Sequence, residues 1–285
     1  MQSVDFFGHK ISKLIVGDNP INGHSYIEDK CTGAEMVEYY TAENIKKALF
    51  HMEECGYTAM LPLAHPYIIR ILGEYRRAGG KMKFIFQPYM PMNQDVSMRE
   101  MMKLDAIGVY HQGTTTDYLY ETNQCDKIIA LIEKYHSMGI PVGLGTHYPE
   151  VIEKSEREGW NVDFYLACMQ NARRKREGEQ SGFLTGKTKQ HLTFHAEDRP
   201  VMLETLKKIS KPVIAFKIFA GGQIFDWDKE QDKSEIIKNA YDEVFSALKP
   251  NDLAAIGVFQ RDEDQIKQNA DLFDEWFREK GKFYV

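Results

Sequence analysis

Short apolar runs alternate along the chain with longer stretches in which apolar residues recur at helical spacing. Eight runs rich in β-branched and aromatic residues indicate strands, at 14–17, 58–63, 83–87, 106–111, 141–145, 163–168, 213–218 and 254–258. Several are almost continuously apolar, as in parallel strands buried on both faces, and each is followed by enough chain for a crossover helix. The pattern predicts a (β/α)8 barrel.

Helix start and stop signals fall between these strands, where a barrel needs its helices. Thr41 is a suitable N-cap for a helix that Gly56 would end in a left-handed conformation. Pro149 suits the first turn of a second helix, which Gly159 would end in the same way. The two kinds of signal therefore agree on the fold class.

Two segments are longer than a minimal barrel needs, at 17–40 after the first strand and at 171–200 after the sixth. Both are βα loops, which open at the end of a barrel where active sites lie. The second begins with the basic run 173–176, which is either a solvated surface or a lid that contacts an anionic group of a ligand.

Length and charge narrow the class of protein. Barrels of this kind are built as one unit of about 250 residues, so we expect the 285 residues to form a single domain over 1–285. The formal net charge of −6 argues against nucleic acid or an anionic membrane as the main partner. The expected partner is a small-molecule substrate, and the oligomeric state is left open.

The first ten residues contain no apolar signal-peptide core, and no run in the sequence is long and apolar enough for a membrane span. We therefore expect a cytoplasmic protein. Its four cysteines are far apart and form no CxxC pair, which fits neither a disulfide scaffold nor a zinc knuckle. Reduced thiols are expected.

Polar side chains follow the predicted strands at their C-terminal ends. In chain order they are Asp18, His65, Gln87, His111, His147, Asn171 and Lys217, with His24 in the first long loop. Because the C-terminal ends of barrel strands meet on one face, these residues predict a polar site, and such a dense polar lining suits a substrate with many hydroxyl or carbonyl groups.

Three of these residues are candidate metal ligands. Imidazole suits zinc and similar divalent metals, and open catalytic zinc sites often have three protein ligands, so His65, His111 and His147 form a candidate triad. In the alternative interpretation each histidine hydrogen-bonds substrate or loop backbone. Lys217, which ends an apolar strand, is open to three roles: a Schiff-base nucleophile, a phosphate contact or the partner of an acidic residue.

Several segments resemble the aldo-keto reductase superfamily over most of the chain. Residues 7–17 look like that family's N-terminal hairpin and first strand, 109–111 like its fourth strand, and 257–259 with 265–269 like its nucleotide-binding turn and helix. The resemblance implies the same barrel fold. It also implies carbonyl reduction with NAD(P)H by a tyrosine, a histidine, a lysine and an aspartate.

Only half of that catalytic set matches this sequence. Tyr67 stands in the place of the catalytic tyrosine and His111 in that of the histidine, but Pro62 replaces the aspartate and Gln87 replaces the lysine. Without the cation, a phenol is a weaker acid near neutral pH.

The cofactor end of the family pattern is better kept. The resemblance places Phe216 where the family stacks an aromatic ring on nicotinamide, and it assigns Gln265 and Asn269 to cofactor binding. An aromatic residue on an apolar strand is also an ordinary core residue.

Three hypotheses follow. The first is a divergent barrel enzyme that acts on a small polar carbonyl or polyhydroxylated, sugar-like molecule by metal- or histidine-assisted isomerase, lyase or hydrolase chemistry, with Asp18 as a base or fourth ligand. The second is an NAD(P)H-dependent oxidoreductase in which Gln87 replaces the lysine beside Tyr67 and His111. The third is a barrel that binds a ligand without turnover.

Overall fold

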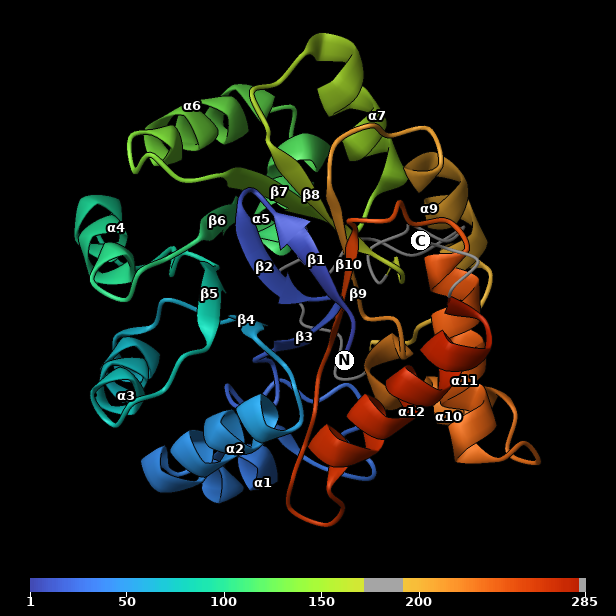
Figure 1. The fold of residues 1–285 in the computed structure, drawn as a ribbon. Coiled ribbons are helices and arrows are strands. Elements are labelled where there is room, and N and C mark those ends of the chain that lie inside the picture. The colour runs from blue at the N-terminus through green and yellow to red at the C-terminus, as the bar shows by residue number, and fades with distance from the viewer. Residues whose placement is uncertain (172–191, 282–285) are drawn as a thin grey trace.

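The eight strands predicted from sequence form a closed parallel barrel in the order β10-β3-β4-β5-β6-β7-β8-β9 (Figure 1). The structure is a computed structural model that describes residues 1–171 and 192–281. The barrel strands are β3 (Leu14–Gly17), β4 (Ala59–Leu61), β5 (Lys83–Phe86), β6 (Gly108–His111), β7 (Val142–Thr146), β8 (Phe164–Cys168), β9 (Val213–Phe216) and β10 (Leu253–Ile256). The prediction of a (β/α)8 barrel is confirmed.

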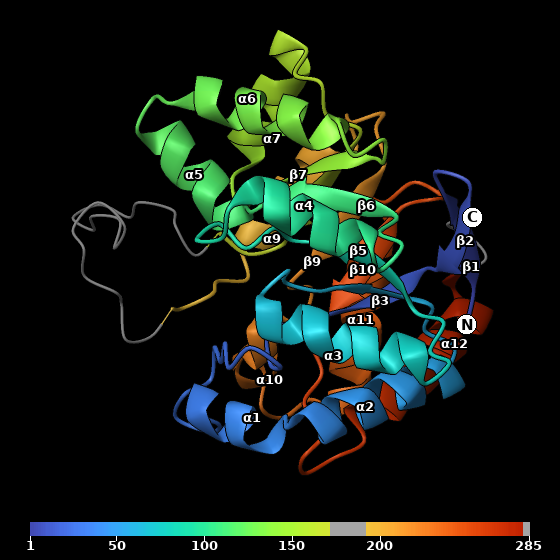
Figure 2. The same ribbon diagram turned by 90° about the vertical axis from the view of Figure 1, so that its left-hand side faces the viewer.

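Helices surround the barrel on its outer side (Figures 1 and 2). They are α1 (Gly33–Tyr39), α2 (Ala42–Glu54), α3 (Pro66–Arg77), α4 (Gln94–Met102), α5 (Gly113–Glu121), α6 (Cys125–His136), α7 (Pro149–Glu158), α9 (Asp198–Leu206), α10 (Ile224–Trp227), α11 (Lys233–Phe245) and α12 (Gln265–Glu279), with a short 3-10 turn, η1 (Ala220–Gly222). Among the helices of 1–171 and 192–281, none is both long and apolar enough to cross a membrane.

The local start and stop signals act as predicted. The Thr41 side chain accepts a hydrogen bond from Asn44 N at the start of α2, and Gly56 follows that helix with φ +88°. Pro149 is the first residue of α7, and Gly159 ends it with φ +65°. The loop after the first strand differs from expectation because it contains α1.

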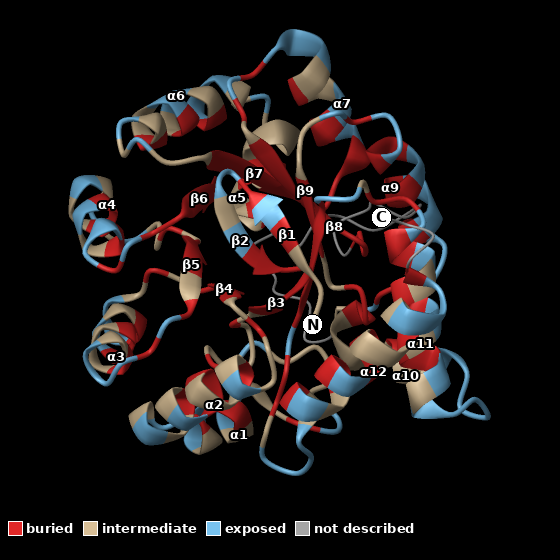
Figure 3. Ribbon diagram, in the orientation of Figure 1, coloured by how far each residue is buried: buried red, intermediate tan, exposed pale blue. Residues whose placement is uncertain are grey.

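Residues of the strands alternate between the barrel interior and the helix layer, and the strands are buried on both faces (Figure 3). The interior cluster contains every second residue, among them Ile85, Tyr110 and Leu166. Their neighbours along the strands, Phe86, Val109 and Ala167, belong instead to the larger cluster under the helices. This alternation decides which residues at the strand ends face the mouth of the barrel.

The N-terminal hairpin of β1 (Ser3–Phe6) and β2 (His9–Ser12) covers one end of the barrel (Figures 1 and 2). Phe6 packs into the interior cluster with its ring 5.2 Å from that of Phe164, which begins β8. The hairpin therefore closes the N-terminal end of the strands. The hairpin does not cover the opposite end of the barrel, where the strands have their C-terminal ends (Figure 1). The basic run 173–176 lies outside the described residues.

Candidate functional site

A cavity of about 640 Å³ opens at the C-terminal ends of the strands. Its lining is formed by residues that follow β3, β4, β5, β6, β7, β9 and β10, together with the first turn of α12. Eight residues singled out from the sequence line this cavity: Asp18, His24, Gln87, His147, Phe216, Lys217, Gln265 and Asn269. Gln112 also lines it.

His65 and Tyr67 belong to the start of α3 and do not line the cavity. The Nδ1 atom of His65 accepts a hydrogen bond from Tyr67 N at 3.2 Å, so the ring caps the helix, and its centre lies 4.8 Å from that of the Tyr89 ring. Tyr67 is 42% exposed. The tyrosine that the family resemblance offers as a catalytic acid is therefore on the surface.

His111 also lies away from the cavity, because the alternation on β6 turns Tyr110 inward and His111 toward α5. The hydroxyl of Thr116 on α5 donates its one hydrogen to Gln112 O at 3.0 Å. The contact of 2.7 Å between that hydroxyl and His111 Nδ1 is therefore a hydrogen bond in which the Nδ1–H of His111 donates. Burial lowers the pKa of His111 to about 4, which keeps the ring neutral. Its role is to join β6 to α5.

The candidate metal triad does not form. His65 is held as a helix cap, His111 faces α5, and only His147 reaches the cavity. Across 1–171 and 192–281 no three histidine, cysteine, aspartate or glutamate side chains are placed to hold a metal ion. The sequence lists histidines at strand ends, but it does not say which face of the strand each one occupies.

Lys217 enters the cavity through a local change of backbone. Phe216, the last residue of β9, packs against the interior cluster, so strict alternation would turn the next residue toward the helices. Lys217 instead has φ +56°, a left-handed conformation that costs energy for a residue with a Cβ. The turn brings its ammonium group into the cavity, 4.5 Å from the centre of the Tyr26 ring and 5.2 Å from that of Phe194.

His147 contacts the ammonium group of Lys217 and links it to buried Asp117. The Nζ atom of Lys217 lies 3.2 Å from His147 Nε2, and His147 Nδ1 lies 2.7 Å from the carboxylate of buried Asp117. Asp117 also accepts from the hydroxyl of Thr146 at 2.6 Å. Nδ1–H donates to Asp117, so Nε2 accepts from the ammonium only while the ring is neutral. Burial lowers the pKa of His147, but Cys168 and Asp117 raise it, and the net pKa is about 9.

The charge on Lys217 is favoured by its neighbours. Burial lowers the pKa of Lys217, but the nearby Tyr26 hydroxyl and Cys168 raise it, and the net pKa lies above its usual value. Lys217 is therefore an ammonium group at neutral pH and not a free amine. This argues against a Schiff-base nucleophile, which has to be unprotonated.

Asp18 is the acidic group of the cavity. It follows β3, is 8% exposed, and accepts hydrogen bonds at Oδ2 from Leu63 N at 2.5 Å and from Asn22 Nδ2 at 2.7 Å. Burial raises the pKa of Asp18 to about 6 despite these two donors. A carboxyl group that titrates so close to neutral pH is suited to accept and return a proton.

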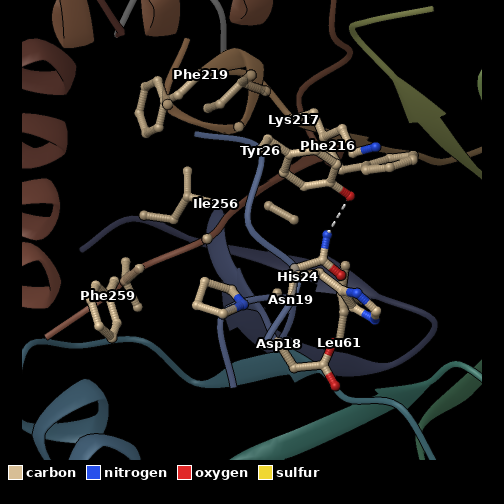
Figure 4. A pocket seen from close by; sticks show the side chains of 18 of the residues that line it. Asp18, Asn19, His24, Tyr26, Leu61, Phe216, Lys217, Phe219, Ile256 and Phe259 are labelled. Carbon is tan, nitrogen blue, oxygen red and sulfur yellow. Dashed lines mark hydrogen bonds between the residues drawn. The ribbon is translucent and has the colours of Figure 1, made fainter. Parts of the chain in front are cut away.

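Tyr26 connects the two ends of the site (Figure 4). Its hydroxyl accepts from Asn19 Nδ2 at 3.1 Å, and Asn19 lies between Tyr26 and Asp18 in the cavity. Sequence reasoning missed Tyr26, Asn19 and Asp117, because they come from a loop and a helix and not from a strand end. A tyrosine in the unusually long loop 17–40 was the one signal available.

The far end of the cavity reaches α12. There Gln265 Oε1 accepts from Phe259 N at 2.8 Å, and the amide of Asn269 is bonded to Gln265 O and to the hydroxyl of Tyr241. Asp262 and Glu263 line this end of the cavity as well. The two residues assigned to cofactor binding by resemblance thus have hydrogen-bond partners within the protein.

Solved structures with the same architecture were found, although no protein-family model and no curated protein matches the sequence. One is an aldo-keto reductase from Bacillus halodurans in its holo form, with TM-score 0.56 and 12% identity over 96% of this chain and 90% of that chain. A candidate 2,5-diketo-D-gluconic acid reductase B has TM-score 0.54 and 10% identity over 96% and 86% of the two chains.

A dihydropteroate synthase from Xanthomonas albilineans is similar to the same degree, with TM-score 0.51 and 13% identity over 97% of this chain and 96% of that chain. Aldo-keto reductases thus stand beside a barrel enzyme of a different kind. At these identities the likeness concerns the arrangement of strands and helices. The chain has the (β/α)8 barrel fold that these proteins share.

Proposed function

We propose that this protein is a barrel enzyme that moves a proton at the carbon next to the carbonyl of a small polar or polyhydroxylated substrate, as an isomerase or epimerase does. In this proposal it is a divergent relative of the aldo-keto reductases that kept the barrel and built a different site. The observation that carries the proposal is that a buried carboxyl group, Asp18, shares one cavity with the Tyr26–Lys217 pair.

Tyr26 is the proton donor of the proposed site. A phenol accepts two hydrogen bonds and donates one. The Tyr26 hydroxyl accepts from Asn19 Nδ2, and the ammonium of Lys217 lies 4.5 Å from the centre of the ring, so the hydroxyl hydrogen is left for a substrate oxygen. Donation to a carbonyl oxygen, supported by the adjacent positive charge, stabilises the negative charge that develops there.

Asp18 is the proton acceptor. The hydrogen bonds from Leu63 N and Asn22 Nδ2 both end on Oδ2, so Oδ1 is the oxygen available to take a proton from the substrate carbon. Above about pH 6 the carboxyl group is ionised and ready to do so. Returning the proton to the neighbouring carbon, while Tyr26 takes back a proton from the neighbouring hydroxyl, gives an isomer. An epimer forms when the opposite face takes a proton from water, and the proton on Asp18 is then released to solvent.

The test is proton exchange with solvent. Small aldoses, ketoses and hydroxy acids are incubated with the protein in D₂O, and loss of the proton next to the carbonyl or hydroxyl carbon is followed by NMR. We expect exchange with the wild type, and a loss of at least about 100-fold with Asp18→Asn and with Tyr26→Phe. Exchange that is equal in the wild type and in both variants would refute the assigned roles.

A nicotinamide-dependent oxidoreductase is the second candidate, favoured by the length of the cavity and by Phe216 at its inner end. The far end fits the phosphates of such a cofactor poorly. At the start of α12, Ile266 N donates to Gln260 Oε1 and Lys267 N donates to Asp264 Oδ1, so these amides are occupied. Asp262 and Glu263 lie at this end as well, ion-paired with Arg261 and with Lys233.

We therefore expect no binding of NADH or NADPH in a fluorescence titration of the wild-type protein. Each cofactor is titrated at low and at physiological salt, because salt screens the interaction of the cofactor phosphates with charged groups of the protein. Saturable binding at either salt concentration would contradict this expectation. Such binding would favour the oxidoreductase hypothesis, with Phe216 and the first turn of α12 as the cofactor-binding residues.

A further inference from the structure

In the part of the chain that the structure describes, the ammonium group of Lys217 has no carboxylate partner at the cavity. Among the residues of 1–171 and 192–281, no aspartate or glutamate oxygen lies within ion-pair distance of its Nζ atom. Three aromatic rings surround it, those of Tyr26, Phe194 and Phe216, with the farthest centre at 5.8 Å. Cation–π contacts of this kind reduce the cost of burying the charge without neutralising it.

The groups around Lys217 divide into two sides. Behind it, away from the cavity lining, lie Asp117, reached through the His147 ring, and Cys168, which is buried at the end of β8. In front, the cavity side presents His24 and the Tyr26 hydroxyl, while Asp18 lies at the other end, beyond Asn19 (Figure 4). The cavity therefore meets the positive end of this array, because the negative charge is behind the imidazole.

The ammonium of Lys217 has N–H groups left for a ligand. Within 1–171 and 192–281, His147 Nε2 is the one atom at hydrogen-bond distance from Nζ, and the remaining neighbours are the aromatic rings. Lys217 lines the cavity, so these N–H groups are available to a ligand there.

We propose that the Lys217 end of the cavity binds a carboxylate group of the substrate. This inference rests on the proposed function and narrows its substrate to a small 2-hydroxy or 2-oxo acid or a sugar acid. A single half-buried ammonium among aromatic rings matches a monoanionic carboxylate. A phosphate dianion needs more donors than the described lining offers at this end.

The placement also orients the substrate. A carboxylate held at Lys217 puts the adjacent carbon and its oxygen beside the Tyr26 hydroxyl, and the rest of the molecule extends toward Asp18. The negative ends of substrate and site are then at opposite ends of the cavity, which avoids repulsion between two carboxylates. A neutral molecule of the same shape gains nothing from Lys217.

The test is binding of three probes, measured by calorimetry: glycolate, its neutral amide glycolamide, and inorganic phosphate. Four proteins are compared: the wild type, Lys217→Met, Lys217→Gln and Asp18→Asn. Thermal melts show that each variant is folded. We expect the wild type to bind glycolate at least about tenfold more tightly than either Lys217 variant does, and glycolamide equally weakly in all.

Asp18→Asn separates this inference from the proposed function, because it removes the proton acceptor and leaves Lys217 in place. Glycolate binding retained in Asp18→Asn supports the carboxylate site even if no proton exchange is ever found. Equal affinity for glycolate and glycolamide in the wild type, or unchanged glycolate affinity in Lys217→Met, overturns the proposal. Phosphate bound more tightly than glycolate overturns the carboxylate assignment.

Discussion

At the residue scale, the site depends on two groups that the barrel keeps in unusual states. Asp18 is a carboxyl group whose pKa burial raises to about 6, and Lys217 is an ammonium group in a left-handed backbone conformation. Both conditions lower the stability of the folded chain, and strained backbone and shifted pKa values are concentrated at functional sites of proteins. Each can be measured without knowing the substrate.

The cost at Asp18 predicts a pH-dependent effect of Asp18→Asn on stability. The pKa of Asp18 is higher in the folded chain than its ordinary value of 3.8, so its stabilising contribution is complete below about pH 4 and is lost as pH rises through about 6. Asparagine has no charge to bury. We expect the variant to gain stability relative to the wild type between pH 4 and pH 8, by up to about 3 kcal/mol.

Urea unfolding at the two pH values measures this difference. Asp5→Asn, at an exposed residue of the hairpin, is the matched control and is expected to show less than about 0.5 kcal/mol of change. A pH-independent effect of Asp18→Asn would mean that Asp18 is not held at a raised pKa. The same titration should appear as a loss of activity below about pH 6.

At the scale of elements, two helices fix the strained turn at the end of β9. Arg199 on α9 donates from Nη2 to Ile218 O and from Nη1 to Glu243 Oε2 on α11, both at 2.6 Å. The carbonyl that it binds is adjacent to Lys217. Arg199 is therefore a positioning residue for the ammonium group.

We expect Arg199→Met to lower the free energy of unfolding by about 2–3 kcal/mol, because a charged hydrogen bond to a buried carbonyl is lost. Glycolate affinity should fall with it, and Arg199→Lys should restore part of both. Glu243→Gln is the control, since the Glu243 side chain is 44% exposed and its loss should cost less than about 1 kcal/mol. Unchanged glycolate affinity in a folded Arg199→Met would limit Arg199 to a structural role.

The close packing of β7 against the start of α5 restricts the size of the side chain at position 145. A Cβ added to Gly145 would lie 2.8 Å from His111 O and 3.0 Å from Gly113 N, and both are backbone atoms. We expect Gly145→Ala to destabilise the fold by about 1–3 kcal/mol in chemical denaturation. In Gly17→Ala the added atom would make an ordinary contact of 3.7 Å, so a comparable loss there would contradict the argument.

At the scale of the whole molecule, the two ends of the barrel have different tasks. The hairpin closes the N-terminal end and the cavity occupies the C-terminal end. Phe6→Ala should cost about 3–5 kcal/mol, because it removes a buried ring from the interior. The neighbouring Phe7→Ala should cost much less, since Phe7 is 41% exposed. Glycolate affinity of the folded protein should be unchanged in both, and a loss in either would show that the ends are coupled.

The sequence by itself determined the barrel. Apolar runs such as those before Gln87 and Lys217, and local signals such as Thr41 and Gly159, predict strands and helix ends because they act over a few residues. The same periodicity placed Asp18, Lys217 and His147 at strand ends, and all three line the cavity.

Only the tertiary structure decided which polar residues face one another. A shift of one position along a strand moves a side chain from the mouth to the helix layer, which is why His111 meets Thr116 and not a substrate. The left-handed turn brings Lys217 from the helix layer into the cavity. Tyr26 comes from a loop whose path no local sequence pattern specifies. Strand ends follow from local chemistry, whereas the partners of each side chain follow from how the whole chain closes.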